Sequence, residues 1–224
     1  MTEKVTKRTK KVKVDPSLPD NTKLRPFVAL KSLSAGIVTE FYKNLSISSV
    51  KRALGIDPSL TGTVAAFYTI SKGDHFIAVH DLSKSVATKG VARVASISNK
   101  LIDLLESYPC NVVVLEDYAH GAAHQAHPLG ELGFALRYCL AELQQIVWPF
   151  GSRVGTVPIG TWKKSLGLAG NAPKIAVQMW LAERYSLYIQ NNDIADSVCL
   201  AIYAMSLITG EIPPKGAVID VTYF

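Results

Sequence analysis

The sequence LGIDPSLTGT at residues 54–63 constrains the fold more than any other stretch of the chain. Residues 51–56 are largely apolar, and the proline, serine and glycine that follow each favour a turn for their own backbone reasons. This pattern predicts a short strand with Asp57 at its C-terminal end, and a second, antiparallel strand at residues 63–70. In open α/β sheets ligands bind at that end of a strand, because loops with free backbone N–H groups gather there.

The next segments predict a second carboxylate beside the first. Residues 75–82 complete an antiparallel meander, and residues 91–105 have the apolar spacing of an amphipathic helix. Residues 111–116 are apolar without alternation, which is typical of a central parallel strand buried on both faces. A right-handed crossover places this strand beside the first one. Glu116 ends it as Asp57 ends the first, although either acid taken singly is better explained as a plain surface residue at a strand exit.

The second half of the chain adds helices and one more strand. Proline favours the first turn of a helix, and glycine favours its C-terminal end. The expected elements are a helix at 129–148, a fifth strand at 153–158, a helical turn at 162–166, a helix from Pro173 to Tyr185, and a last helix from near Asp193 to Gly210. Together with the first half they predict an α/β fold in which a five-stranded mixed sheet is flanked by helices.

Composition limits the class of protein. The chain has 224 residues, of which 48% are hydrophobic, enough for one buried domain. No apolar run approaches the roughly 18–20 residues that span a membrane, and the N-terminus lacks the pattern of a secretory signal. The three cysteines, Cys110, Cys139 and Cys199, are widely spaced in apolar segments. We expect them to be buried and reduced, which fits a cytoplasmic protein.

The positive charge is concentrated at the N-terminus. Residues 1–25 contain eight lysines or arginines against three acidic residues, whereas the whole chain carries a net charge of +6. Such an arm suits a polyanionic partner, most simply nucleic acid, through neutralisation of phosphates. A disordered solubilising tail has the same composition, and the sequence does not separate the two interpretations.

Two further acids open the last predicted helix. Asp193 and Asp196 are three residues apart and therefore share a helix face. Capping of the helix N-terminus explains such a pair without any function. With Asp57 and Glu116, however, they make four carboxylates from three elements, an oxygen-rich set suited to Mg²⁺ or Mn²⁺ rather than to zinc. Two such ions about 4 Å apart can activate water for phosphodiester hydrolysis.

These acidic segments resemble those of a known family. GIDPSLTG at 55–62, VVLE at 113–116 and DIADSVCLA at 193–201 are similar, in the same order, to the three acidic motifs of the RuvC-like Holliday junction resolvases. KKSLGLAGNAPK at 163–174 resembles the family's two-lysine segment. The resemblance covers residues 51–208, and the runs at 129–133 and 157–163 are similar to bacteriophage members especially.

The resemblance implies a ribonuclease H-like fold, a homodimer, and Mg²⁺-dependent incision of four-way DNA junctions, with Mn²⁺ as a possible substitute. It thus implies a crossover junction endodeoxyribonuclease. The implied metal ligands are Asp57, Glu116, Asp193 and Asp196. Lys163 and Lys174 are implied as catalytic residues that meet DNA phosphate or the charge developing on it. The implied DNA contacts are Lys163, Lys164, Lys174 and Tyr118.

The chain departs from the bacterial members in two places. Residues 1–50 form a basic extension that those proteins lack, before a nuclease domain at 51–210 and a tail at 211–224. Bacterial members also carry an aromatic residue three positions after the glutamate, where this chain has Ala119. Tyr118 is the nearest substitute for that residue.

Parts of the sequence also fit three other classes of function. The opening motif also resembles the first phosphate loop of sugar kinases and actin-like ATPases, but the chain is short for a two-domain kinase and lacks a later glycine-rich phosphate loop. A non-catalytic DNA-binding module is expected to have lost an acid, and none is missing. A general branched-DNA or flap nuclease of the same fold stays open. His120, His124 and His127 fit no standard zinc spacing, so we expect a polar loop there.

The predicted helix at 129–148 has two interpretations. Its leucines at positions 132, 136, 140 and 143 recur along one face, as in a dimer contact. An ordinary core helix has the same spacing, and the two interpretations are equally favoured.

Overall fold

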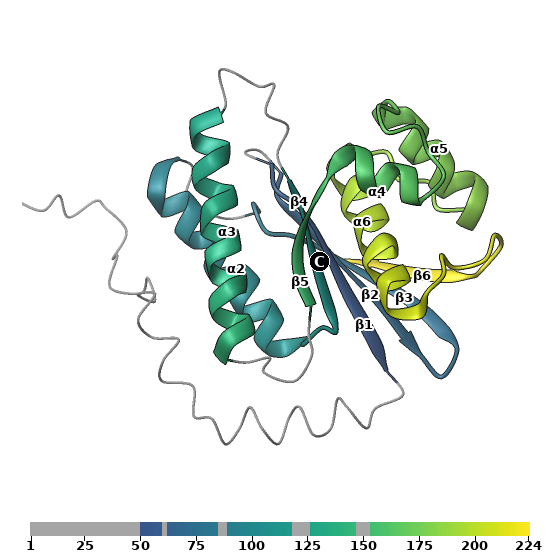
Figure 1. Ribbon diagram of the computed structural model, residues 1–224, viewed down its shortest axis with the longest axis horizontal. Helices are drawn as coiled ribbons and strands as arrows, with labels where there is room; N and C mark the ends of the chain where they lie inside the picture. The colour runs from purple at the N-terminus through teal and green to yellow at the C-terminus, as the bar shows by residue number, and fades with distance from the viewer. Residues whose placement is uncertain (1–49, 60–61, 85–88, 118–125, 147–152) are drawn as a thin grey trace, which may run out of the picture.

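The computed structural model describes residues 50–59, 62–84, 89–117, 126–146 and 153–224. A six-stranded sheet in the order β5-β4-β1-β2-β3-β6 forms its centre (Figure 1). The strands are β1 Lys51–Asp57, β2 Val64–Ser71, β3 Asp74–Asp81, β4 Val112–Asp117, β5 Arg153–Pro158 and β6 Ile219–Tyr223. The helices are α2 Gly90–Ser107, α3 Ala126–Ile146, α4 Ile159–Ser165, α5 Lys174–Tyr185 and α6 Asn192–Thr209.

The topology of the sheet confirms the predicted mixed arrangement. Strands β1, β2 and β3 form the antiparallel meander, and β4 pairs parallel with β1 after the α2 crossover. Strand β5 continues the parallel half beside β4. The predicted α/β fold, with helices flanking the sheet, is therefore confirmed.

The predicted number of strands is wrong by one. The sixth strand, β6, lies in residues 211–224, where the sequence predicts only a tail, and it pairs parallel with β3 at the sheet edge. Only Ile219 of its five residues is buried, so β6 carries little of the hydrophobic pattern that identifies a strand. Its partner β3 lies more than a hundred residues earlier, and sequence periodicity does not reveal such a pairing.

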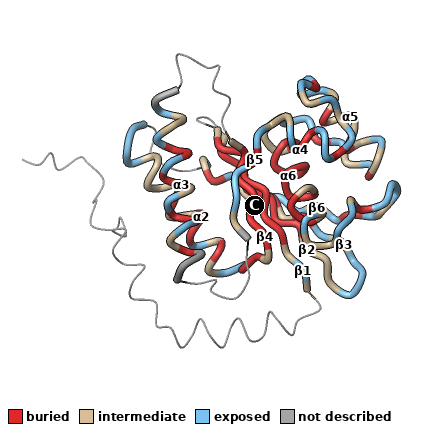
Figure 2. The backbone as a smooth tube through the Cα atoms, viewed as in Figure 1, coloured by how far each residue is buried: buried red, intermediate tan, exposed pale blue. Residues whose placement is uncertain are grey.

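Helices cover the two faces of the sheet in two groups (Figures 1 and 2). Along β1, Leu54 and Ile56 pack with α2 and α3 in one core cluster, whereas Ala53 belongs to the other cluster with residues of α4, α5 and α6. This alternation is the period of two expected of a strand that is buried on both sides. Asp57 follows Ala53 and Gly55 on the face covered by α6.

Gly55 brings α6 unusually close to the sheet. A Cβ atom at this position would lie 2.3 Å from the backbone nitrogen of Ala201 and 2.6 Å from the carbonyl oxygen of Ser197. No side chain fits between the β1 and α6 backbones at this point, so only glycine permits the contact. The contact fixes α6 against β1 two residues before the strand delivers Asp57.

Candidate acidic active site

Asp57 and Glu116 end neighbouring parallel strands on the same face of the sheet. The register pairs Gly55 with Val114 and Ile56 with Leu115, so the next position along places Asp57 opposite Glu116. Both acids are buried, with 8% and 9% of their surface exposed. Two buried carboxylates at one rim carry a large desolvation cost unless a cation or a proton compensates them.

Asp193 and Asp196 lie at the start of α6, as the sequence predicts, but Asp193 does not cap the helix. The cap is Asn191, whose side-chain oxygen accepts hydrogen bonds from the backbone N–H groups of Asp193, at 2.9 Å, and Ile194, at 3.1 Å. The capping explanation for Asp193 therefore fails. Its carboxylate is left for other partners.

The turn after β1 touches the acid at the start of α6. A Cβ atom at Gly62 would lie 2.8 Å from the Oδ2 atom of Asp193. The turn itself is held by Ser59, whose hydroxyl accepts a hydrogen bond from the Gly62 N–H at 3.3 Å. The segment that follows Asp57 thus lies close to Asp193 at the start of α6.

A tryptophan that the sequence did not single out holds Glu116. Trp162 lies on α4 and is fully buried, and its indole Nε1–H donates a hydrogen bond to Oε2 of Glu116 at 2.8 Å. The two residues are 46 positions apart, so no local pattern indicates the contact. The only available signal is the adjacency of Trp162 to Lys163 in the two-lysine segment.

Burial and mutual repulsion shape the charge of the site. Burial raises the pKa of Asp57 well above its ordinary value. The negative charges of the other three acids raise it further, and the positive charge of Lys174 lowers it. The charge on Asp57 is thus influenced by three acids that come from two other elements, β4 and α6.

Two more of these acids hold their protons more tightly than usual. Burial raises the pKa of Glu116 to about 7, the hydrogen bond from Trp162 and the charges of Lys163 and Lys174 lower it, and Asp196 raises it. Burial likewise raises the pKa of Asp196, against the lowering effect of the two lysines. The carboxylates of the site therefore outnumber the positive charges near them, which favours the binding of a cation.

The predicted lysines occupy different environments. Lys163 is buried, and its ammonium group donates a hydrogen bond to the carbonyl oxygen of Ala172 at 2.8 Å. Lys174 is exposed and forms an ion pair with Asp193, with Nζ 3.5 Å from Oδ1. Lys164 is exposed on α4. Lys174 and Lys164 are thus accessible from solvent, whereas Lys163 faces the acids from inside the protein.

The donor chemistry of the site fits a hard divalent cation. The Oδ1 atom of Asp196 is buried and has no hydrogen-bond partner among the described residues, which is costly for a carboxylate oxygen. Mg²⁺ and Mn²⁺ take such oxygen ligands. Within the described ranges, no three histidine, cysteine, aspartate or glutamate side chains are grouped closely enough to form a ready-made metal cluster. The site therefore has donor atoms of the kind that bind such a cation, but they are not arranged as a preformed metal site.

Several predicted features lie outside the described residues. They are Tyr118, Ala119, His120 and His124, together with the basic arm at 1–25. The predicted helix at 129–148 is α3, and its leucines at positions 132, 136, 140 and 143 are all in the core cluster against the sheet. The dimer interpretation of that face is wrong, and the core interpretation holds.

Two predictions from composition are consistent with the structure. Cys110, Cys139 and Cys199 are free thiols, and all three are buried. Among the described residues, no helix combines the length and the apolar character needed to cross a membrane.

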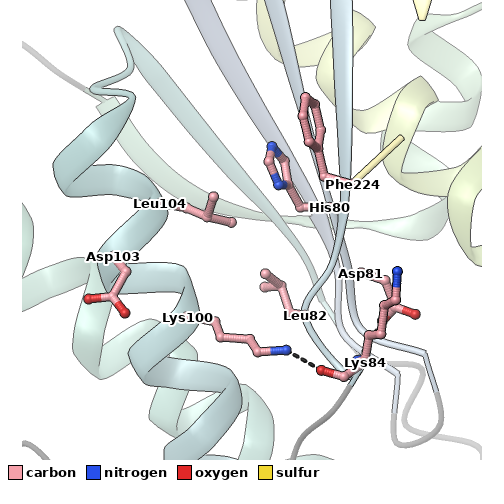
Figure 3. A pocket seen from close by; sticks show the side chains of 8 residues that line it. All are labelled: His80, Asp81, Leu82, Lys84, Lys100, Asp103, Leu104 and Phe224. Atoms are coloured by element: carbon pink, nitrogen blue, oxygen red, sulfur yellow. Dashed lines mark hydrogen bonds between the residues drawn. The ribbon is translucent and has the colours of Figure 1, made fainter. Parts of the chain in front are cut away.

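A hollow of about 340 Å³ between β3 and α2 offers a contrast to the acidic site (Figure 3). His80 stacks on Phe224 there with ring centroids 4.8 Å apart, and Lys100 donates a hydrogen bond to the backbone carbonyl of Lys84. Lysine and aspartate side chains both line the hollow, and none of the four acids does. Its charges are mixed, so it lacks the concentration of like charge that marks the acidic site.

Comparison with known proteins identifies the fold. No protein-family model and no curated protein sequence matches the chain. Among solved structures, Thermus thermophilus RuvC is similar, with a TM-score of 0.52 at 20% identity over 73% of this chain and 99% of RuvC. A complex of T. thermophilus RuvC with Holliday junction substrate gives a TM-score of 0.55 at 18% identity over the same shares. The expected ribonuclease H-like fold is confirmed, and it is the fold of RuvC.

Proposed function

We propose that this protein is a divalent-metal-dependent nuclease that resolves four-way DNA junctions by hydrolysing phosphodiester bonds. One observation carries the proposal: four carboxylates come from β1, β4 and α6 at the rim of a RuvC-like sheet, where burial and the charges of Glu116, Asp196 and Asp193 raise the pKa of Asp57. The RuvC complex with Holliday junction substrate supports the choice of branched DNA as the substrate class. Residues 51–210 are the proposed nuclease domain.

The proposed roles follow from burial and charge. Asp57, Glu116, Asp193 and Asp196 would hold Mg²⁺, or Mn²⁺ in its place. When bound, such ions activate water and stabilise the leaving oxygen of a phosphodiester. The acids repel DNA phosphate unless their charge is compensated, so these residues couple cation binding to the approach of the substrate.

Two lysines complement the acids in different ways. Lys174 is exposed beside Asp193 and can exchange that ion pair for a DNA phosphate. Lys163 is buried near Glu116 and Asp196, so its positive charge would act on the site from within. Lys164, on the exposed side of α4, is a proposed phosphate contact, as are the basic residues of the arm at 1–25.

Matched DNA substrates test the activity. Purified protein with Mg²⁺ is incubated with four-way, three-way, flap and linear duplex DNA of shared sequence. We expect cutting of the four-way junction. Asp57→Asn and Asp196→Asn should lose cleavage by at least about a thousandfold while binding the junction as well or better, because each variant removes a ligand and a negative charge. Asp220→Asn, an exposed acid on β6, is the control. Preferential cutting of flaps would instead indicate a debranching nuclease, and near-normal cleavage by both site variants would refute the assignment.

A homodimer fits a substrate with two equivalent strands to cut. We propose that it forms through an apolar groove of about 600 Å³ between α2 and α3. Val91 and Phe134 line the groove and are 80% and 68% exposed. We expect the protein to sediment as a dimer, to nick the junction at two symmetry-related positions, and to become monomeric on Phe134→Glu. Sedimentation as a monomer, or a single nick, would count against paired cleavage.

The arm is tested by salt dependence. Removal of residues 1–25 takes away eight positive charges, and contact with several phosphates would make the slope of log affinity against log salt clearly shallower. An unchanged slope would show that the arm does not touch DNA.

A further inference from the structure

The indole of Trp162 is buried, and its hydrogen-bond acceptor is the carboxylate of Glu116. A buried tryptophan N–H normally finds an acceptor, because leaving it unpaired is costly. Here the acceptor is a carboxylate oxygen in the proposed metal site, at 2.8 Å, with the donor ring fully buried and Glu116 only 9% exposed. A hydrogen bond to a charged acceptor is stronger than one to a neutral carbonyl.

The donor sits on a short, firmly anchored helix. The N–H of Leu166 bonds back to the carbonyl of Trp162 at 3.1 Å, which closes the last turn of α4. The next residue, Lys163, places its ammonium group 5.4 Å from the centre of the Trp162 ring and bonds to Ala172. The helix backbone therefore anchors the residue and the Lys163 ammonium group contacts its ring, so the indole N–H is positioned before any cation arrives.

The acceptor needs such a restraint. A glutamate side chain has several rotatable bonds, and Glu116 is the penultimate residue of β4, at the rim of the sheet. The Trp162 hydrogen bond engages Oε2, and among the described residues Oε1 accepts no hydrogen bond. One oxygen is thus fixed by the protein while the other stays available to a ligand.

We propose that Trp162 is a positioning residue, which orients the Glu116 carboxylate so that its second oxygen can bind a divalent cation. The residue acts through Glu116 and touches neither DNA nor the reacting phosphate. Partners that orient metal ligands commonly change metal affinity by about 10- to 100-fold when they are removed. This inference rests on the proposed function, and its test uses cation binding as well as cleavage.

The first experiment needs no change to the tryptophan. The chain has three tryptophans, so ¹⁵N-indole labelling of the full protein gives three N–H resonances. We expect Glu116→Gln to shift the Trp162 resonance, because the substitution changes the acceptor of its hydrogen bond. Substoichiometric Mn²⁺ should broaden it selectively. Trp180 is the internal control, since it contacts Tyr185 and Arg184. A Trp162 signal that responds no more than the Trp180 signal would overturn the proposal.

The second experiment removes the N–H donor. Trp162→Phe should raise the dissociation constant for Mn²⁺, measured by calorimetry, by about tenfold or more, and should raise the Mg²⁺ concentration for half-maximal cleavage in parallel. Metal-free junction affinity should change by less than about twofold. Trp180→Phe, the same substitution on α5, should leave both metal measurements unchanged. If Trp162→Phe does not fold, the indole resonances decide alone.

A double-mutant cycle separates positioning from general stability. In a Glu116→Gln background, Trp162→Phe should cause no further loss of Mn²⁺ affinity, because the indole has no ligand left to orient. Additive losses would mean that the tryptophan acts only as core packing, and would overturn the proposal. A wild-type protein that binds Mn²⁺ in this Trp162-dependent manner but cuts no branched DNA would refute the proposed function and leave the positioning role standing. If Trp162→Phe cleaves junctions with the metal dependence of the wild type, the positioning role is refuted and the proposed function stands.

Discussion

The two faces of the sheet are packed in different ways. On the α2 and α3 face, large aliphatic side chains such as Leu101 and Leu136 fill the space between helix and strand. On the opposite face, the backbones of α6 and β1 are in contact at Gly55. A Cβ atom added there would lie closest to backbone atoms of Ala201 and Ser197. Side-chain packing tolerates adjustment, because neighbouring side chains can move, whereas two touching backbones cannot. The face covered by α6 also carries the four acids, so the backbone contact lies beside the proposed active site.

Gly55→Ala should have the largest effect on stability. It tests whether the β1 and α6 backbones are too close together to admit a side chain. The new Cβ would meet backbone atoms at 2.3–2.7 Å, so α6 must move away from β1. We expect at least about 4 kcal/mol of destabilisation, above the usual range for overpacking because no flexible side chain can yield. Urea unfolding of the purified variants measures it. Gly155→Ala is the matched control in β5, with no atom within 4 Å of the added carbon. Similar stability of the two variants would contradict the contrast between the faces.

Leu101→Ala should weaken the other face without touching the chemistry. Leu101 is fully buried on α2, and truncation of such a leucine costs about 3 kcal/mol through lost transfer energy and a cavity. Under conditions where the variant remains folded, the cleavage rate per folded molecule should equal that of the wild type. Stability from urea unfolding and single-turnover cleavage give the two numbers. A rate loss beyond the unfolded fraction would show that the two faces are coupled.

Glu116→Gln should stabilise the metal-free protein at neutral and alkaline pH. Glu116 binds its proton more tightly in the folded chain, where burial raises its pKa from 4.5 to about 7. The folded state therefore loses stability as pH rises from about 4.5 to about 7, and above that the loss is constant. We expect the variant to be more stable than wild type by on the order of 2–3 kcal/mol at pH 8, and by almost nothing at pH 4.5.

Thermal or urea unfolding across this pH range, in the presence of a chelator, checks the sign. Glu183→Gln, an exposed glutamate on α5, is the control for a charge change alone. A stability difference that shrinks as pH rises would mean that the fold already compensates the Glu116 charge.

Gly62→Ala should have the smallest effect on stability and a selective effect on function. Its added carbon would meet only the Oδ2 end of Asp193, at 2.8 Å, and a side-chain end can rotate away. We expect a stability change within about 1 kcal/mol, but a rise of about tenfold in the Mg²⁺ needed for cleavage, because Asp193 is displaced. Gly130→Ala on α3, where the added carbon meets nothing within 4 Å, should leave the metal requirement unchanged. Equal metal requirements in both variants would argue against Asp193 as a ligand.

The sequence predicts the acids well because their placement depends on short-range rules. Strand ends at Asp57 and Glu116 follow from apolar runs that stop at a turn, and the crossover rule makes the two strands neighbours. The pair at the start of α6 follows from helical spacing. Each of these inferences needs only a few consecutive residues and one topological rule.

The missed features all depend on contacts between distant segments. Trp162 reaches Glu116 across 46 positions, and β6 pairs with β3, more than a hundred residues earlier. Gly55 did carry a signal, since glycine within a strand indicates a bulge or a close backbone approach. The sequence does not say which element approaches it. Lys163, expected to meet DNA phosphate or the charge developing on it, is buried, and its role stays a prediction. The spacing of two lysines does not reveal which one is exposed.

The capping role of Asn191 has a consequence for genome annotation. Many ordinary helices begin with two acids three residues apart, so a search for that pair alone returns mostly structural helix starts. In this chain an asparagine two residues ahead of Asp193 takes the cap, so Asp193 itself does not cap the helix. A search that requires Asn-x-Asp-x-x-Asp at the start of an apolar helix would discard candidates whose first acid serves as the cap. Divergent proteins that no family profile detects could be screened by this six-residue criterion.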